Sequence, residues 1–159
     1  AGDPRARALR GRALLAAGRA REALLEIDLL SASEYVRFDP SLWGDAVRAR
    51  LATGDEAGAI ALLETTLGGR HPSWHEGWRL LADAYDRRGR AEDAARARRN
   101  ADIVVANRAA QFRHDAAVAL WSGDTDEAIT YLSAAVRLAP DDEDAQQELA
   151  RLLEPDAGR

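Results

Sequence analysis

Apolar residues recur every three or four positions along most of the chain, and glycine or proline interrupts the pattern at intervals. The helical spacing is clearest where four residues share one face: Trp78, Leu81, Ala82 and Tyr85. No segment has the pattern of a β-strand. The distribution of apolar and polar positions therefore predicts an all-α fold.

Four glycines occupy equivalent positions in an internal repeat, at spacings of 36, 35 and 34 residues: Gly18, Gly54, Gly89 and Gly123. An alanine follows each of them by five residues: Ala23, Ala59, Ala94 and Ala128. Eleven residues before them stand Arg7, Trp43, Trp78 and Phe112, and seven before stand Gly11, Val47, Ala82 and Ala116. A register shared by glycine, alanine, aromatic and small residues indicates repeated units.

Each unit is expected to be an antiparallel pair of helices. The glycine closes the first helix, because the left-handed conformation of a tight turn suits a residue without Cβ. A second helix then begins, as at Asp124, which is an expected N-cap with Glu127 three residues later in the arrangement of a capping box. The alanine after the turn is small because the two helices cross closely there.

These repeated positions resemble the tetratricopeptide repeat family. The third unit matches best, through Trp78, Leu81, Ala82, Tyr85, Gly89 and Ala94. The fourth has Phe112, Ala116, Gly123, Ala128, Leu132, Ala135 and Pro140, and the second has Trp43, Gly54, Ala59 and Leu63, with Pro72 one residue late. The first departs from the pattern, since Arg7 and Arg10 replace an aromatic residue and a leucine. Arg98 and Asp115 are further departures.

The resemblance implies an α-solenoid of about four helix hairpins and a C-terminal capping helix, within a single domain that covers residues 1–159. The expected units are residues 4–39, 40–74, 75–108 and 109–142, followed by the capping helix at 142–153. Asp3-Pro4 and Asp39-Pro40 read as an N-cap followed by proline at the first helical position. Ser73 after Pro72 and Asp141 after Pro140 are expected to begin helices in the same way.

Two segments depart from the regular scheme. Residues 31–38 lengthen the first hairpin, through either a longer second helix or a short loop. Between Ala91 and Trp121 there is neither glycine nor proline, so two helices could join there. We expect a turn near Asn107.

The amino-acid composition excludes several kinds of catalytic and binding site. Apolar residues make up 47% and charged residues 31%, and the net charge of −5 argues against nucleic acid as the main partner. All 22 basic residues are arginine, which excludes a Schiff-base lysine and the lysine of a phosphate-binding loop. The lack of cysteine excludes thiol catalysis and disulfides. No stretch is apolar over the ~18 residues that a membrane span requires.

The residues with catalytic or metal-binding chemistry do not form a recognisable site. His71 and His75 are four apart, but Pro72 lies between them, which favours a structural or solvent role over a metal site. The acidic pairs Asp141-Asp142 and Glu92-Asp93 stand at helix starts, where carboxylates favour the helix dipole. We therefore expect no catalytic residue, no metal and no cofactor.

The aromatic residues at the repeated positions, Trp43, Trp78 and Phe112, are expected to pack inside the hairpins rather than form a binding stripe. Trp121 is different, because it stands two residues before Gly123. It either packs on the capping region or lines the concave surface.

The inner face of the first helices is the candidate binding groove. The resemblance implies that it contains Arg12, Arg48, Arg79, Asp83, Arg113, His114 and Trp121. Arginine side chains can bind a carboxylate through two hydrogen bonds. The alternative is that these arginines pair with acidic residues of the same face, which include Asp45, Glu76, Asp83 and Asp86. The lysine/asparagine clamp of some family members is absent at the matching positions.

The resemblance implies a protein-interaction scaffold whose groove accepts a protein or peptide segment, one of acidic character given Arg48, Arg79 and Arg113. The alternative is an accessory repeat domain excised from a larger enzyme, secretion component or regulator, which the absence of methionine favours. An enzyme in its own right is disfavoured, because the nucleophilic and hydrolytic constellations are missing. Neither compartment nor oligomeric state follows from the sequence.

Overall fold

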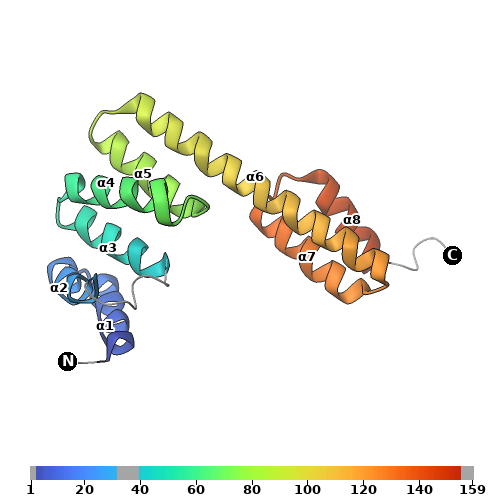
Figure 1. Ribbon diagram of the computed structural model, residues 1–159, viewed down its shortest axis with the longest axis horizontal. Helices are drawn as coiled ribbons and strands as arrows, with labels where there is room; N and C mark the ends of the chain where they lie inside the picture. The colour runs from blue at the N-terminus through green and yellow to red at the C-terminus, as the bar shows by residue number, and fades with distance from the viewer. Residues whose placement is uncertain (1–2, 32–39, 155–159) are drawn as a thin grey trace. The chain divides into compact units, whose positions relative to one another are not determined.

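A computed structural model of the chain describes residues 3–31 and 40–154. In these residues all regular structure is helical, which confirms the predicted all-α class (Figure 1). The elements are α1 (Pro4–Ala16), α2 (Ala20–Ser31), α3 (Pro40–Ala52), α4 (Glu56–Thr65), the π-helical turn η2 (Thr66–Arg70), α5 (His75–Arg87), α6 (Ala91–Ser122), α7 (Thr125–Leu138) and α8 (Glu143–Leu153). The predictions for residues 32–38 and for an N-cap at Asp39 lie outside the described residues.

The four repeated glycines close α1, α3, α5 and α6 in the left-handed conformation that was predicted for them. Their φ angles are +73° at Gly18, +82° at Gly54, +68° at Gly89 and +84° at Gly123. After each glycine, the next residue donates its backbone N–H to the carbonyl five positions earlier, at 2.9 Å in all four turns. This bond satisfies a carbonyl at the helix end that would otherwise lack a partner. The four turns are therefore built alike.

Aspartate side chains cap the starts of α1, α4, α7 and α8. Asp3 and Asp124, as predicted, accept the backbone N–H of Arg5 at 3.0 Å and of Glu127 at 2.9 Å. The predicted start of the last helix at Asp141 is wrong by one residue, because Asp142 accepts the N–H of Ala145 at 3.1 Å.

The predicted start of α5 at Ser73 is also wrong. The backbone N–H of Trp74 donates to the carbonyl of His71 at 3.1 Å, so residues 71–74 form a turn. The helix begins only at His75, after this turn is complete, and Trp74 occupies the N-cap position without a side-chain capping bond.

The predicted turn near Asn107 is wrong, because α6 is a single helix from Ala91 to Ser122. Asparagine in a helix interior costs only about 0.7 kcal/mol relative to alanine. Ending a helix leaves up to four carbonyls and four N–H groups that need new partners. Without glycine or proline in the segment, continuing the helix costs less than breaking it.

The chain divides into two compact units, Ala1–Ala101 and Asp102–Arg159, with the boundary inside α6. The core of the first unit is formed by α3, α4, α5 and the start of α6, and contains Val47, Ala59, Leu63, Leu67, Leu81, Ala82, Tyr85 and Ala94. Trp78 packs against this cluster and donates its indole N–H to the carbonyl of Pro72 at 2.8 Å. Trp43 packs against a smaller cluster of Ala8, Leu30 and Leu42.

The second unit consists of the C-terminal part of α6 with α7 and α8. Its buried core is Ala116, Ala119, Ala128 and Leu132. Phe112 of α6 stacks on Tyr131 of α7 with 6.5 Å between the ring centroids, and the Arg108 guanidinium lies 4.7 Å from the Phe112 ring. Alanines at the crossing points let the helices of this unit approach closely.

Candidate binding surface

Asp45 of α3 is a buried carboxylate held between two arginines. Arg12 of α1 donates from Nε to Asp45 Oδ2 at 3.0 Å, and its Nη2 lies 2.9 Å from the same oxygen. Arg48 donates from Nη1 to Asp45 Oδ1 at 3.2 Å. The Asp45 side chain is 7% exposed, whereas the arginine side chains are 50% and 57% exposed. These three residues, called the arginine cluster below, carry two positive charges and one negative charge.

Trp74, a residue without a predicted role, lies beside the arginine cluster. A Cβ atom on Gly44 of α3 would stand 3.4 Å from Arg48 Nη1 and 3.4 Å from Trp74 Cζ2, so both side chains border this glycine. The indole also covers Gly77 of α5, where a Cβ would stand only 2.2 Å from Trp74 Cε3. The junction of α3 and α5 therefore presents an arginine and an indole next to each other. The only sequence signal was the glycine three residues after the tryptophan.

Arg79 and Asp83 both lie on the exposed side of α5. Within the described part of the chain, neither side chain forms an ion pair. Helix α3, which carries Arg48, contacts both α1 and α5. The first unit therefore brings the helices with Arg12, Arg48 and Arg79 into one row.

The other predicted groove residues belong to the second unit. Arg113 of α6 donates from Nη1 to both oxygens of Asp142 and from Nη2 to Asp144, each at 3.4 Å. His114 is exposed. The alternative in which Trp121 packs on the capping region is wrong, because this residue is 90% exposed. Three of the four predicted groove arginines, Arg12, Arg48 and Arg113, pair with carboxylates of the chain itself.

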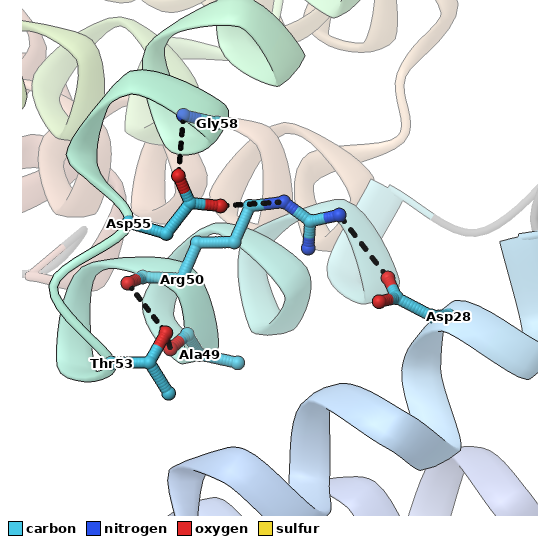
Figure 2. A network of polar contacts seen from close by, with 6 residues as sticks. All are labelled: Asp28, Ala49, Arg50, Thr53, Asp55 and Gly58. Carbon is cyan, nitrogen blue, oxygen red and sulfur yellow. Dashed lines mark hydrogen bonds and ion pairs between the residues drawn. The ribbon is translucent and has the colours of Figure 1, made fainter.

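Arg50, another residue without a predicted role, joins three helices (Figure 2). Its Nη2 donates to Asp28 Oδ1 of α2 at 3.2 Å, and its Nε lies 3.8 Å from Asp55 Oδ2. Asp55 in turn caps α4 by accepting the N–H of Gly58 at 2.9 Å. This network ties the first hairpin to the second, and so helps to hold Arg12 against Asp45. The sequence carried no signal for it, because the partners are 22 and 5 residues away from Arg50.

No metal centre forms in residues 3–31 and 40–154, where no three His, Asp or Glu side chains gather suitably for a metal ion. His71 lies in the turn before α5, and Nδ1 of His75 stands 3.5 Å from Glu76 Oε2. Among the described helices, none combines the length and apolar character needed to cross a bilayer.

The C-terminal helices match a known family. Residues 116–152, which include the end of α6, all of α7 and all but the last residue of α8, match the sequence profile of the tetratricopeptide repeat. This segment is similar to a tetratricopeptide repeat. A search of the curated proteins finds no match.

Solved structures extend the tetratricopeptide-like fold to the whole chain. Two crystal structures of nearly identical TPR-like repeats, from a Podospora anserina protein described as a kinesin light chain, are similar to it. One has a TM-score of 0.55 at 20% identity and covers 100% of this chain and 90% of its own. The other, a variant of the same protein, has a TM-score of 0.53 at 21% identity and covers 98% and 87%. Tetratricopeptide repeats are in general protein–protein interaction modules, and the fold is typically non-catalytic.

The departures from the tetratricopeptide pattern have local explanations. Arg7 and Arg10 of the first unit both pair with Glu26 of α2, at 3.1 and 3.3 Å. An ion pair therefore replaces the aromatic and leucine contacts on this helix face. Arg98 forms an ion pair with Asp86.

The hydroxyl of Tyr85 on α5 lies in an environment that raises its pKa. It is buried, its hydroxyl donates to Glu64 Oε1 of α4 at 2.6 Å, and the Arg90 guanidinium lies 4.3 Å from its ring centroid. Burial and the hydrogen bond to Glu64 raise the pKa of Tyr85 from 10.0 to about 12. The folded state therefore favours the protonated phenol.

We expect Tyr85→Phe to lower the free energy of unfolding by about 1 kcal/mol at neutral pH, because the hydrogen bond to Glu64 is lost. The loss is modest because water can solvate the Glu64 carboxylate in the variant. Because the folded pKa is raised, the stabilisation is fully present below pH 10 and is lost as pH rises toward about 12. Urea unfolding followed by circular dichroism from about pH 7 to about pH 12 measures both effects. An alkaline decline as steep in the variant as in the wild type would contradict the assignment.

Proposed function

We propose that this protein is a scaffold that binds an acidic segment of a partner protein on the surface formed by α1, α3 and α5. The observation that carries the proposal is the arginine cluster, in which a buried Asp45 orients two half-exposed arginines. The general role of tetratricopeptide repeats in protein interaction supports it. Arg113 is left out, because Asp142 and Asp144 already engage its charge.

The cluster suits a carboxylate because Asp45 orients the Arg48 guanidinium without using all of its hydrogen-bond donors. Arg48 uses one nitrogen, Nη1, for Asp45, and within residues 3–31 and 40–154 its other N–H groups form no hydrogen bond, so that they can bind a ligand. Its hydrogen bond to Asp45 restricts the side chain before binding, which lowers the entropy lost on binding. Hydrogen bonds between two charged groups are the strong ones in recognition.

Arg79 adds a second positive charge on the neighbouring helix α5. Asp83, one turn further along α5, adds a negative charge to the same exposed side. This order of charges would match a partner segment that has one carboxylate for Arg48 and a second for Arg79. A basic or polar residue further along the segment would then meet Asp83. The Trp74 ring beside Arg48 offers an apolar contact for the same segment.

The test is selection of short peptides from a phage-displayed random library against the chain, followed by fluorescence anisotropy on the selected sequences. We expect enrichment of Asp and Glu. The double variant Arg48→Ala/Arg79→Ala should weaken binding roughly 10-fold or more, since each lost charged hydrogen bond costs about 1.5–3 kcal/mol.

The matched control is Arg21→Ala, which removes an exposed arginine from α2 and should change the affinity less than about 2-fold. Selection of uncharged peptides, or equal affinities for the double variant and the wild type, would disprove the proposal. Circular dichroism of each variant separates loss of binding from loss of folding.

A further inference from the structure

The C-terminal part of α6 exposes a long face without a formally charged residue. Six exposed residues follow one another at spacings of four and three: Ile103, Asn107, Ala110, His114, Ala117 and Trp121. We call this set the α6 face. All six lie within the second unit and none is part of the arginine cluster. This spacing is the heptad pattern of helices that pack along their length.

The α6 face differs from other solvated surfaces of this chain. Charged residues make up 31% of the sequence, yet His114 is the only titratable member of the face. Trp121 is 90% exposed and Ile103 is 56% exposed, and Val118, at the edge of the face, is 52% exposed. A helix face of this kind in water gains free energy when another apolar surface covers it.

We propose that the α6 face pairs with the same face of a second copy of this chain, in antiparallel orientation. The six positions are symmetric about Phe112. A twofold axis at that level sets Ile103 opposite Trp121 of the second copy, Asn107 opposite its Ala117, and Ala110 opposite its His114. The pairing is isologous and therefore closes as a dimer.

The sizes of the side chains fit this arrangement. Each of the four inner layers contains one alanine of the α6 face, so the helix axes can approach to about 8 Å. The outer layers place an indole against an isoleucine at both ends. A parallel pairing would instead set Trp121 against Trp121 and align the two helix dipoles, which is less favourable.

Charge also favours a second copy over an acidic or basic partner. The residues that border the face are Val104 and Gln111 on one side and Ala106 and Arg113 on the other. The charge of Arg113 is compensated by Asp142 and Asp144. Two uncharged faces with these borders meet without repulsion, whereas a charged partner would find no counter-charge.

Sedimentation equilibrium over about 10 μM to about 1 mM tests the dimer. We expect concentration-dependent association toward twice the monomer mass of 17.3 kDa. Ala110→Glu and Trp121→Ala should each raise the dissociation constant at least about 10-fold, because the first removes a charged carboxylate from water when the interface forms and the second removes the largest contact.

Two control variants test whether the change in dissociation constant is specific to the α6 face. Ala61→Glu places the same charge on an exposed position of α4 and should leave the dissociation constant within about 2-fold of wild type. Arg48→Ala/Arg79→Ala should also leave it unchanged, so failure of the dimer and failure of the peptide-binding proposal are separable. All mutated positions of the α6 face are exposed, and circular dichroism verifies folding. A chain that stays monomeric at about 1 mM, or a dimer insensitive to both variants, overturns the proposal.

The orientation has its own test, because the chain contains no cysteine. A spin label on a single introduced cysteine, Ile103→Cys, should show a distance of about 27 Å or more between copies in the antiparallel dimer. A label at Ala110→Cys should show a much shorter distance. Short distances at both positions would indicate a parallel pair and contradict the proposed geometry.

Discussion

Replacing Gly77 with alanine is expected to lower the free energy of unfolding by about 2–3 kcal/mol. Removing a glycine from a helix usually stabilises it by up to about 1 kcal/mol, so the expected sign is unusual. The reason is the Trp74 ring, since a Cβ on Gly77 would lie 2.2 Å from Cε3 and 2.6 Å from Cδ2. The indole packs against the core of the first unit and borders Gly44 on its other side, so it has little room to move.

Urea unfolding followed by circular dichroism measures the effect, with Gly44→Ala as the matched control. A Cβ at Gly44 meets Trp74 and Arg48 at 3.4 Å, an ordinary van der Waals distance, so this variant should be neutral or slightly stabilising. In a Trp74→Ala background the clash is gone, and Gly77→Ala should then be neutral or stabilising as well. Additive effects in this double-mutant cycle would contradict the account.

Leu132→Ala is expected to cost about 3–5 kcal/mol, the upper part of the range for buried leucine. Leu132 is completely buried in the core of the second unit. The other buried members of that core are Ala116, Ala119 and Ala128, whose side chains cannot rearrange to fill a cavity. The loss therefore includes both the transfer of the leucine side chain and an unrelaxed cavity.

The matched control for Leu132→Ala is Leu153→Ala on α8, where the leucine is 59% exposed. This variant should change the free energy of unfolding by less than about 0.5 kcal/mol. Chemical denaturation, with both curves fitted to the same m-value, compares the free energies of unfolding of the two variants. If both variants had similar costs, the core assigned to the second unit would be wrong.

The turns were predictable because their causes are local. A glycine in the left-handed conformation and a carboxylate three residues before a backbone N–H act within a few residues, as at Gly123 and Asp124. The wrong predictions, a helix start at Ser73 and a turn near Asn107, also concern local structure. At these two places the predicted and the observed conformations differ little in free energy. A turn that precedes α5, and a helix that continues through an asparagine, depend on small differences that a pattern of residue types does not resolve.

For the candidate surface, the sequence predicted which residues belong to it but not the contacts between them. The sequence predicted that Arg12, Arg48 and Arg79 lie on first helices. It did not predict that Asp45 pairs with two of them, or that Arg79 has no ion-pair partner in the part of the chain that the structure describes. Nor did it indicate the position of Trp74. Such contacts join residues that are far apart in the chain, and one sequence contains no information on which of several carboxylates a given arginine will meet.

By itself, the sequence determined that this protein is all-α and that its helices reverse direction at four glycines, because helical periodicity and left-handed turns are properties of short segments. Only the tertiary structure decided that α6 runs unbroken from Ala91 to Ser122, that Asp45 is buried between Arg12 and Arg48, and that Trp121 is exposed. Those outcomes follow from how helices pack against one another. Packing depends on the shapes and charges of surfaces that form only when the chain has folded.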